Sequence, residues 1–191
     1  MSRTLTIATI QGNNNALEVE HGHYLSVPGA PVQTVYFRTD ARTIYASATS
    51  GDGNPITDLN ITITPRKVGN ILVLTWMMNA EVHHDNVFVI HKNGNLITDS
   101  GVEGYNNVNG NVRYSGFVPS YYDNDYASTP SNYMIQYITT VENTLTRTYC
   151  PAVRGAGATA YTMYLNMPAG STGADSYEVT VSTGVGMEIG T

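Results

Sequence analysis

The chain has 191 residues, 41% of them hydrophobic, so it can bury a core and fits one domain with or without an extension, which excludes a disordered tail. Only 13% of the residues are charged, about half the roughly 25% of average globular proteins, so uncharged polar residues or another copy of the chain must cover the surface. The formal net charge of -6 argues against nucleic-acid binding, which needs a concentrated basic face.

Residues 1–28 are predicted to form an extension that precedes the main domain, residues 29–191. Residues 16–20 and 23–27 are predicted as two short strands, and Pro28-Gly29 marks the boundary. Because an extension of this size cannot hold a core of its own, we expect it to lie on its own domain, on a sister chain or on a partner. It shows no signal peptide, so we expect a protein that leaves the cell by a route other than secretion, if it acts outside.

The next two predicted strands differ in how many of their faces are apolar. Residues 59–63 alternate between apolar and polar side chains, which predicts a strand with one wet face that ends at Pro65. Residues 71–78 are apolar on both faces, which predicts a strand buried between two layers or between a sheet and a neighbouring subunit. This run is far shorter than the roughly 20 residues of a membrane-spanning helix.

A β-hairpin is predicted from residues 87–92 and 95–98, because Asn93 and Gly94 tolerate the positive φ angles of a tight type I′ turn. Further strands are predicted at residues 133–140, 145–149, 159–167 and 177–188. Short strands separated by turn signals indicate an all-β sandwich or barrel, and an antiparallel jelly roll accommodates this number of strands.

Four stretches of the chain match, in the same order, successive segments of one known sequence pattern. The first stretch carries it at Leu17, Val19, Gly22, His23, Leu25, Val27, Gly29, Val32 and Gln33. The second carries it at Ile56, Leu59, Ile63, Thr64, Pro65, Ile71, Leu72 and Val73. The hairpin VFVIHKNGNLI and the closing VGMEIG complete it. This succession resembles phage virion and tail-fibre proteins with a C-terminal tumour-necrosis-factor-like jelly roll, and it departs from them at Val68-Gly69-Asn70, where Ser and Lys are common.

The resemblance implies an antiparallel jelly-roll β-sandwich with a short N-terminal β extension, assembled as a homotrimer. It also implies a non-enzymatic role on the virion surface, with other virion proteins as partners. We expect no cofactor, and the acidic charge and the short apolar runs lead us to expect no nucleic-acid or membrane partner. The low charge content and the doubly apolar strand at 71–78 independently agree with a subunit interface. Trimerisation would also cover strand edges that otherwise invite aggregation.

Two groups of histidines raise the question of a metal site. The His-His-Asp stretch at 83–85, with His91, is interpreted as a turn, since neighbouring residues on a strand point to opposite faces. His21 and His23 share a face if the strand runs straight through Gly22, and a threefold axis would turn two ligands into six. The phage fibre proteins that this chain resembles use such His-x-His pairs to hold iron on the trimer axis, whereas a turn at Gly22 would spoil that geometry.

No nucleophile motif is present in the sequence. There is no G-x-S-x-G elbow and no phosphate-cradling loop, and Cys150 has no histidine near it in sequence. We therefore expect Cys150 to be a small buried hydrophobe and the protein not to be an enzyme, although triads assembled from distant residues escape such a search.

Tyrosines concentrate between residues 105 and 137, mixed with Asn and Asp. Tyrosine offers a large contact area at low entropic cost, and the amides and carboxylates supply adaptable hydrogen bonds, a mixture common in binding surfaces. The candidate recognition residues for a host-surface glycan are Tyr105, Tyr114, Tyr121, Tyr122 and Tyr126. The alternative is that these tyrosines fill the trimer interface or cover long loops. Residues 123–125 (Asp-Asn-Asp) also suggest calcium, but without EF-hand spacing.

These observations lead to two main hypotheses. The first is a homotrimeric capsid-surface decoration protein, of the cement or head-fibre type, attached to the major capsid protein or another virion protein by residues 1–28. The second is the receptor-binding tip of a phage tail fibre, active in host attachment. A cellular lectin-like or cytokine-like domain is a third reading, which the lack of a signal peptide and of disulfides disfavours.

Overall fold

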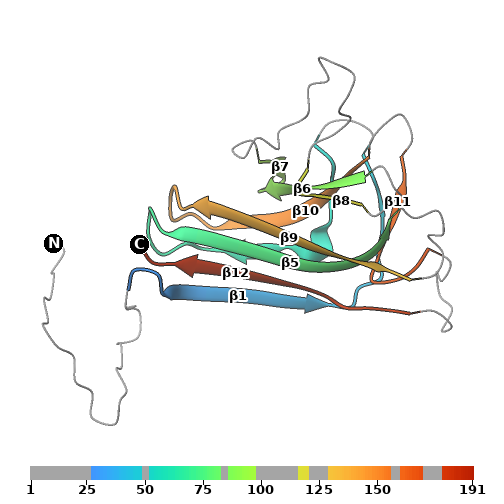
Figure 1. Ribbon diagram of the computed structural model, residues 1–191. Helices are drawn as coiled ribbons and strands as arrows, with labels where there is room; N and C mark the ends of the chain where they lie inside the picture. The colour runs from blue at the N-terminus through green and yellow to red at the C-terminus, as the bar shows by residue number, and fades with distance from the viewer. Residues whose placement is uncertain are drawn as a thin grey trace, which may run out of the picture.

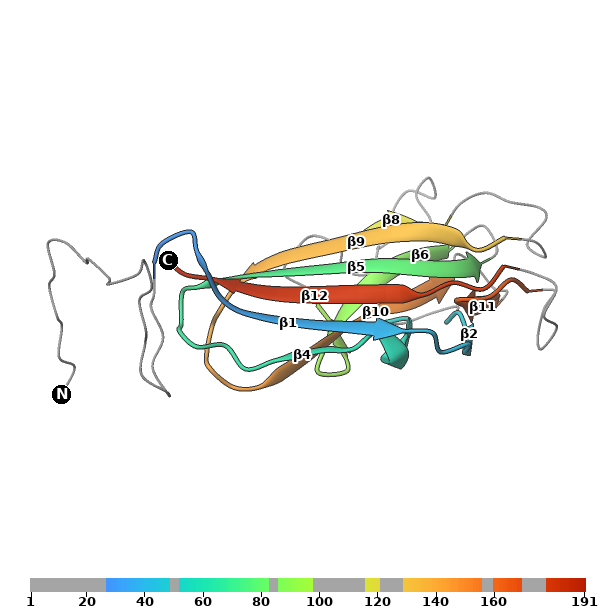
Figure 2. The same cartoon turned by 90° about the horizontal axis from the view of Figure 1, so that it is seen from below.

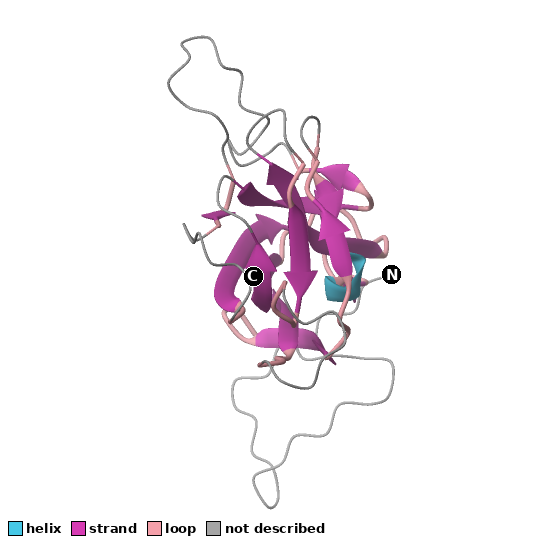
Figure 3. Ribbon diagram, turned by 90° about the vertical axis from the view of Figure 1, so that its right-hand side faces the viewer, coloured by secondary structure: helices cyan, strands magenta, loops and turns pink. Residues whose placement is uncertain are grey.

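The computed structural model describes residues 27–48, 52–82, 86–97, 116–120, 129–155, 160–169 and 178–191. Strands dominate this part of the chain, and all pairings between its named strands are antiparallel. Figure 1 shows the strands in two layers, and Figure 3 shows how little helix accompanies them. The expectation of an all-β protein with antiparallel sheets is therefore confirmed, and the layers are consistent with a β-sandwich.

The first sheet contains six strands and forms the lower layer of Figure 1. Its long strands lie in the order β1 (Pro31–Thr39), β12 (Ser182–Ile189), β5 (Ile71–Val82) and β9 (Ser131–Thr140). Two short strands, β11 (Thr162–Leu165) and β2 (Ile44–Ala46), continue the sheet beside the last residues of β5. Figure 2 looks onto this sheet from below and shows the long strands side by side.

The second sheet also contains six strands, mostly short ones. Its order is β3 (Asn54–Pro55), β10 (Arg147–Gly155), β6 (Asn86–Lys92) and β7 (Asn95–Leu96). In addition, β4 (Ile61–Ile63) pairs with β10, and β8 (Val118–Pro119) pairs with β6. A single helical turn, η2 (Thr57–Leu59), connects β3 to β4.

The core lies between the two sheets, because strand alternation sends every second side chain inward. From β5 the inward side chains are those of Leu72, Leu74, Trp76 and Met78, all fully buried. The indole N–H of Trp76 donates to the carbonyl oxygen of Leu59 at 2.8 Å, so its polar atom is satisfied inside the core. Phe88 of the second sheet and Tyr133 of the first bring their ring centroids within 4.9 Å of each other across this space.

The predicted hairpin is confirmed. Strands β6 and β7 pair antiparallel, and the two turn residues have the left-handed φ angles that a type I′ turn requires, 53° at Asn93 and 83° at Gly94. The backbone N–H of Thr148 donates to the Asn93 side-chain oxygen at 2.9 Å, which ties the turn to β10. Local turn chemistry alone was therefore enough to locate this element.

Several other strands have bounds in the structure that differ from the predicted ones. Leu59 lies in η2, so the strand expected at 59–63 is only Ile61–Ile63. The strand expected at 145–149 starts later and continues through Pro151 to Gly155, while those expected at 159–167 and 177–188 shorten to β11 and β12. The first strand, Pro31–Thr39, was not predicted.

The expectation that residues 71–78 are buried on both faces is wrong for the chain on its own. Leu72 and Leu74 are buried, but on the other face Met77 is 51% exposed and Val73 is half-buried. The strand is central in its sheet, between β12 and β9, but it carries a second layer on one side only. The alternative, that the second apolar face of residues 71–78 contacts a neighbouring subunit, stays a prediction.

The predicted strands and histidine pair of residues 1–26 lie outside the described residues. At the expected boundary, residues 27–30 form a turn in which the N–H of Ala30 donates to the carbonyl oxygen of Val27 at 3.0 Å. Gly29 and Ala30 then bond to Gly190, each at 2.9 Å. The described residues contain no helix that is both long and apolar enough to cross a membrane.

Candidate functional site

Most residues singled out from the sequence lie outside the described part of the chain. These are the five candidate recognition tyrosines Tyr105, Tyr114, Tyr121, Tyr122 and Tyr126, the pair His21 and His23, and residues 83–85 and 123–125. Within the described ranges, no three residues of the types His, Cys, Asp and Glu come together in a way that could hold a metal ion. The geometry of the described residues therefore has to be searched independently of these predictions.

His91 is the one histidine in the described ranges, and it is buried in β6. Its Nε2 lies 2.7 Å from the carbonyl oxygen of Asp52. Because a carbonyl only accepts, Nε2 must carry the proton, and the imidazole holds the chain before β3 against the second sheet. This contact gives His91 a structural role in β6.

Cys150 lies opposite His91 on the adjacent strand β10. Its thiol is buried and free, and burial raises its pKa to about 11. The nucleophilic form of cysteine is the thiolate, so a thiol with this pKa is almost entirely protonated near neutral pH. Cys150 behaves as the small buried hydrophobe that the sequence predicted.

The most unusual surface in the described residues is the outer face of the first sheet. We define the outer face as the solvent-directed residues of β1, β12, β5 and β9, namely Thr34, Tyr36, Arg38, Thr183, Val185, Met187, Ile189, Ile71, Val73, Thr75, Met77, Asn79, Asn132, Met134, Gln136, Ile138 and Thr140. Arg38, on the edge strand β1, is the one charged residue among them. Where one face of an antiparallel sheet is open to water, side chains along each strand normally alternate between apolar ones toward the core and polar or charged ones toward the water.

Strand pairing arranges the outer face in rows. One row contains Thr34, Met187, Val73 and Ile138, and the next contains Tyr36, Val185, Thr75 and Gln136. A third contains Arg38, Thr183, Met77 and Met134. Neighbours in a row stand roughly 5 Å apart, so their side chains form one continuous surface.

Large apolar side chains of the outer face are open to solvent. Tyr36 is 83% exposed, Met134 60% and Ile138 58%. Amide side chains bond within the same surface, since Gln136 donates to Thr75 at 3.4 Å and Asn132 donates to Asn79 at 3.0 Å. The face therefore combines exposed apolar side chains with uncharged polar ones and carries no charge on three of its four strands. Exposed apolar side chains that gather on one surface typically contact a partner.

The second sheet does not offer an equivalent surface. Its central strands β6 and β10 are buried on both faces, and Val89 and Ala152 are fully buried although they point away from the core. The chain around Gly53 lies against this side, where a Cβ on Gly53 would be 3.4 Å from a Val89 methyl. Gly53 has a φ of 85°, which glycine adopts without strain.

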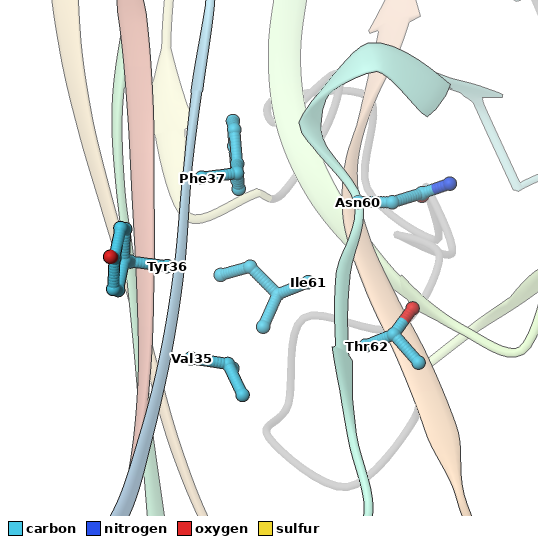
Figure 4. A pocket seen from close by; sticks show the side chains of 6 residues that line it. All are labelled: Val35, Tyr36, Phe37, Asn60, Ile61 and Thr62. Atoms are coloured by element: carbon cyan, nitrogen blue, oxygen red, sulfur yellow. The ribbon is translucent and has the colours of Figure 1, made fainter.

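A small pocket opens between the two edge strands β1 and β4. Its volume is about 70 Å³, and Val35, Phe37 and Ile61 point into it while Tyr36 points away (Figure 4). A volume of this size holds one small side chain or a few waters, so the pocket is too small to bury a substrate. It marks the place where the two sheets fail to close, and the outer face remains the better candidate site.

Comparison of the chain with protein-family models and with curated proteins finds no match. The sequence signal that could have located the outer face is the stretch from Tyr133 to Ile138, which is free of charge and, apart from Gln136, apolar on both faces. It was predicted as a strand, but its exposed side was not recognised as part of a larger surface. Tyr36 was missed with the rest of β1.

Proposed function

We propose that this protein is a non-enzymatic bacteriophage virion structural protein, a homotrimeric decoration protein on the capsid surface that attaches through residues 1–28. The observation that carries the assembly part of this proposal is the outer face, which exposes large apolar side chains and is charged only at Arg38. Exposed side chains such as Met134 and Ile138 leave water when copies of the chain associate, and that burial stabilises a complex by roughly 25 cal/mol per Å² before the costs of association.

The strand order supports the jelly-roll part of the proposal. The last strand β12 lies between β1 and β5, and β10 lies between β4 and β6, so these neighbours are distant in sequence. From β5 onward the long strands β5, β6, β9, β10 and β12 alternate between the two sheets, as expected for two antiparallel sheets connected as Greek keys. The position on a virion rests on the sequence resemblance.

The state of assembly is tested by sedimentation velocity of the purified full chain. We expect a species of three times the 20.7 kDa chain mass at micromolar concentration. Ile138→Glu places a charge on the outer face, where the side chain is 58% exposed, and should shift the protein to monomer. Leu145→Glu is the matched control, because Leu145 is 71% exposed but precedes β10 in the second sheet. A wild-type monomer, or equal effects of both substitutions, contradicts the assembly proposal.

The position on the particle is tested separately, by mass spectrometry of virion heads freed of tails. A decoration protein must be present on these heads in multiples of three per site. Its absence from heads and presence in purified tails would refute the capsid assignment while leaving the trimer intact.

The receptor-binding alternative rests on the composition of residues 105–137, where tyrosines are mixed with asparagine and aspartate. It predicts that the purified protein binds host cells and competes with the virus. Tyr121→Ala or Tyr122→Ala should then weaken binding by about 1 to 3 kcal/mol if either residue is a hot spot. No binding at micromolar protein counts against this alternative.

A further inference from the structure

Glu188, near the end of β12, is a fully buried carboxylate with an unusually complete set of donors. The backbone N–H of Arg66 donates to both of its oxygens, at 2.8 and 2.9 Å, and the N–H of Lys67 donates at 3.1 Å. The side-chain amide of Asn70 donates at 2.7 Å and that of Gln33 at 2.5 Å. Hydrogen bonds to a charged acceptor are the stronger kind, so this group stabilises whatever it connects.

The carboxylate and its donors come from three separate segments. Gln33 belongs to β1, residues 66–70 form the turn between β4 and β5, and Glu188 itself belongs to β12. Gln33 also donates to the carbonyl oxygen of Thr64 at 2.8 Å, which links β1 to the start of the turn. One side chain therefore holds together segments that are more than 100 positions apart in sequence.

The last residues of the chain are fixed to the same turn. The N–H of Thr191 donates to the Asn70 side-chain oxygen at 3.2 Å, and the Lys67 ammonium donates to the Thr191 carbonyl oxygen at 2.8 Å. Gly190 in turn exchanges two backbone bonds with Gly29 and Ala30, where the described part of the chain begins. Figure 2 shows this end of the sandwich, where β1 starts and β12 finishes.

We propose that Glu188 and the turn at 66–70 form an acid-released clamp that holds residues 27–33 and 188–191 to one end of the sandwich. Protonation removes the charge and turns one carboxylate oxygen into a donor that faces other donors. The clamp then opens locally, while the second sheet and the pairing of β12 with β5 persist. This inference does not depend on the proposed function.

The groups around Glu188 indicate that protonation of Glu188 itself controls the opening of the clamp. Burial by itself raises the pKa of Glu188, but the hydrogen bonds from Gln33, Asn70, Arg66 and Lys67 outweigh it and lower the pKa below the usual value. Among the described residues, β1 faces it with Gln33, β5 with Leu72 and the turn with Asn70, all of them uncharged. The turn adds the exposed basic side chains of Arg66 and Lys67.

The sign of the pH effect follows from this lowered pKa. The native state holds Glu188 ionised at pH values where an unfolded glutamate already binds protons. The clamp therefore contributes its full stabilisation above the ordinary glutamate pKa of about 4.3, and loses it as the pH falls through the lower native value.

The test is hydrogen exchange of the full-length protein, read by mass spectrometry and corrected for intrinsic exchange rates. Between about pH 7 and about pH 3, protection of residues 27–33 and 64–70 should fall at least about tenfold, while protection of β6 and β10 stays within about twofold. Glu188→Gln should show the reduced protection already near neutral pH and lose most of its pH dependence. Glu142→Gln is the matched control, since Glu142 is exposed and should behave as wild type.

A second variant covers the case in which Glu188→Gln does not fold. Gln33→Ala removes one donor and leaves the other four bonds, so it should open the same segments by a smaller factor at every pH. Loss of protection in β6 and β10 together with the clamp segments at acid pH would overturn the proposal, because it would show global rather than local opening. Unchanged protection of residues 27–33 in wild type across the pH range would also overturn it.

Discussion

Gly184 lets the ring of Phe37 pack against the inner face of β12, and this contact supports a quantitative prediction. A Cβ at position 184 would lie 2.1 Å from Cε1 of Phe37 and 2.7 Å from Cζ. Non-bonded carbons approach to roughly 3.5 to 4.0 Å, so Gly184→Ala must displace the ring by about 1.5 Å or more. Phe37 belongs to the edge strand β1, beside the pocket shared with Ile61, and can turn toward solvent there.

The expected loss of stability depends on whether the Phe37 ring or strand β1 moves. If the ring turns outward, a half-buried phenylalanine loses most of its burial, which is worth about 1 to 2 kcal/mol out of the 1.5 to 3 for a fully buried side chain. If the ring stays and β1 shifts, overpacking costs about 1 to 3 kcal/mol. Gly184→Ala should therefore destabilise the fold by about 1 to 3 kcal/mol.

The assay is urea unfolding followed by the fluorescence of Trp76, which is the single tryptophan of the sequence and fully buried. All samples should be compared at one protein concentration, since self-association would make stability depend on it. Phe37→Ala is made as a second variant, and the two changes are then combined. Without the ring, the alanine at position 184 meets no clash. The double variant should therefore lose about 1 to 3 kcal/mol less unfolding free energy than the sum of the losses in the two single variants.

Additivity is the result that refutes this reasoning. If the costs of Gly184→Ala and Phe37→Ala sum to within about 0.5 kcal/mol in the double variant, the ring does not occupy the space over Gly184.

Three further predictions concern polar and reactive groups in the core. Trp76→Phe leaves the Leu59 carbonyl without its donor and should cost about 1 to 3 kcal/mol, measured by urea unfolding with circular dichroism because the fluorescent reporter is lost. Asn166 has a φ of 57°, so Asn166→Ala should be less stable than Asn166→Gly by about 1 kcal/mol, and equal melting temperatures would contradict this. Cys150, with its pKa raised to about 11, should resist a thiol reagent at about pH 8 in the native protein and react at once in urea. Rapid labelling of the native protein would contradict its burial.

The elements that could be predicted from sequence are those with a complete local signal. Asn93-Gly94 carries the turn chemistry of the hairpin within two residues, and the apolar run that starts at Ile71 defines β5. The strand before Pro151 was ended too early because proline reads as a strand breaker in a local window. In the structure Pro151 stays within β10, and its carbonyl oxygen accepts from the N–H of Ile56 at 2.8 Å.

The candidate site could not be predicted in the same way, because it depends on strand order. Tyr36 and Met134 lie on one surface only because β12 and β5 stand between their strands, and no local window contains that information. Glu188 is a similar case. Its place in an alternating strand suggests nothing unusual, while its donor Gln33 is 155 positions away.

The two sheets differ in which strands are covered on both sides, and this difference bears on where a partner can bind. The sequence predicted double burial for residues 71–78, but the strands that have it are β6 and β10. Their outward side is held by the chain itself, through contacts such as Asp52 with His91. The outer face, in contrast, keeps Met77 half exposed. A charge content of 13% is low for the whole chain, yet on the outer face it falls to Arg38 alone. The shortage of charge therefore affects a defined surface, and depletion of charged residues is typical of the core of a protein–protein interface.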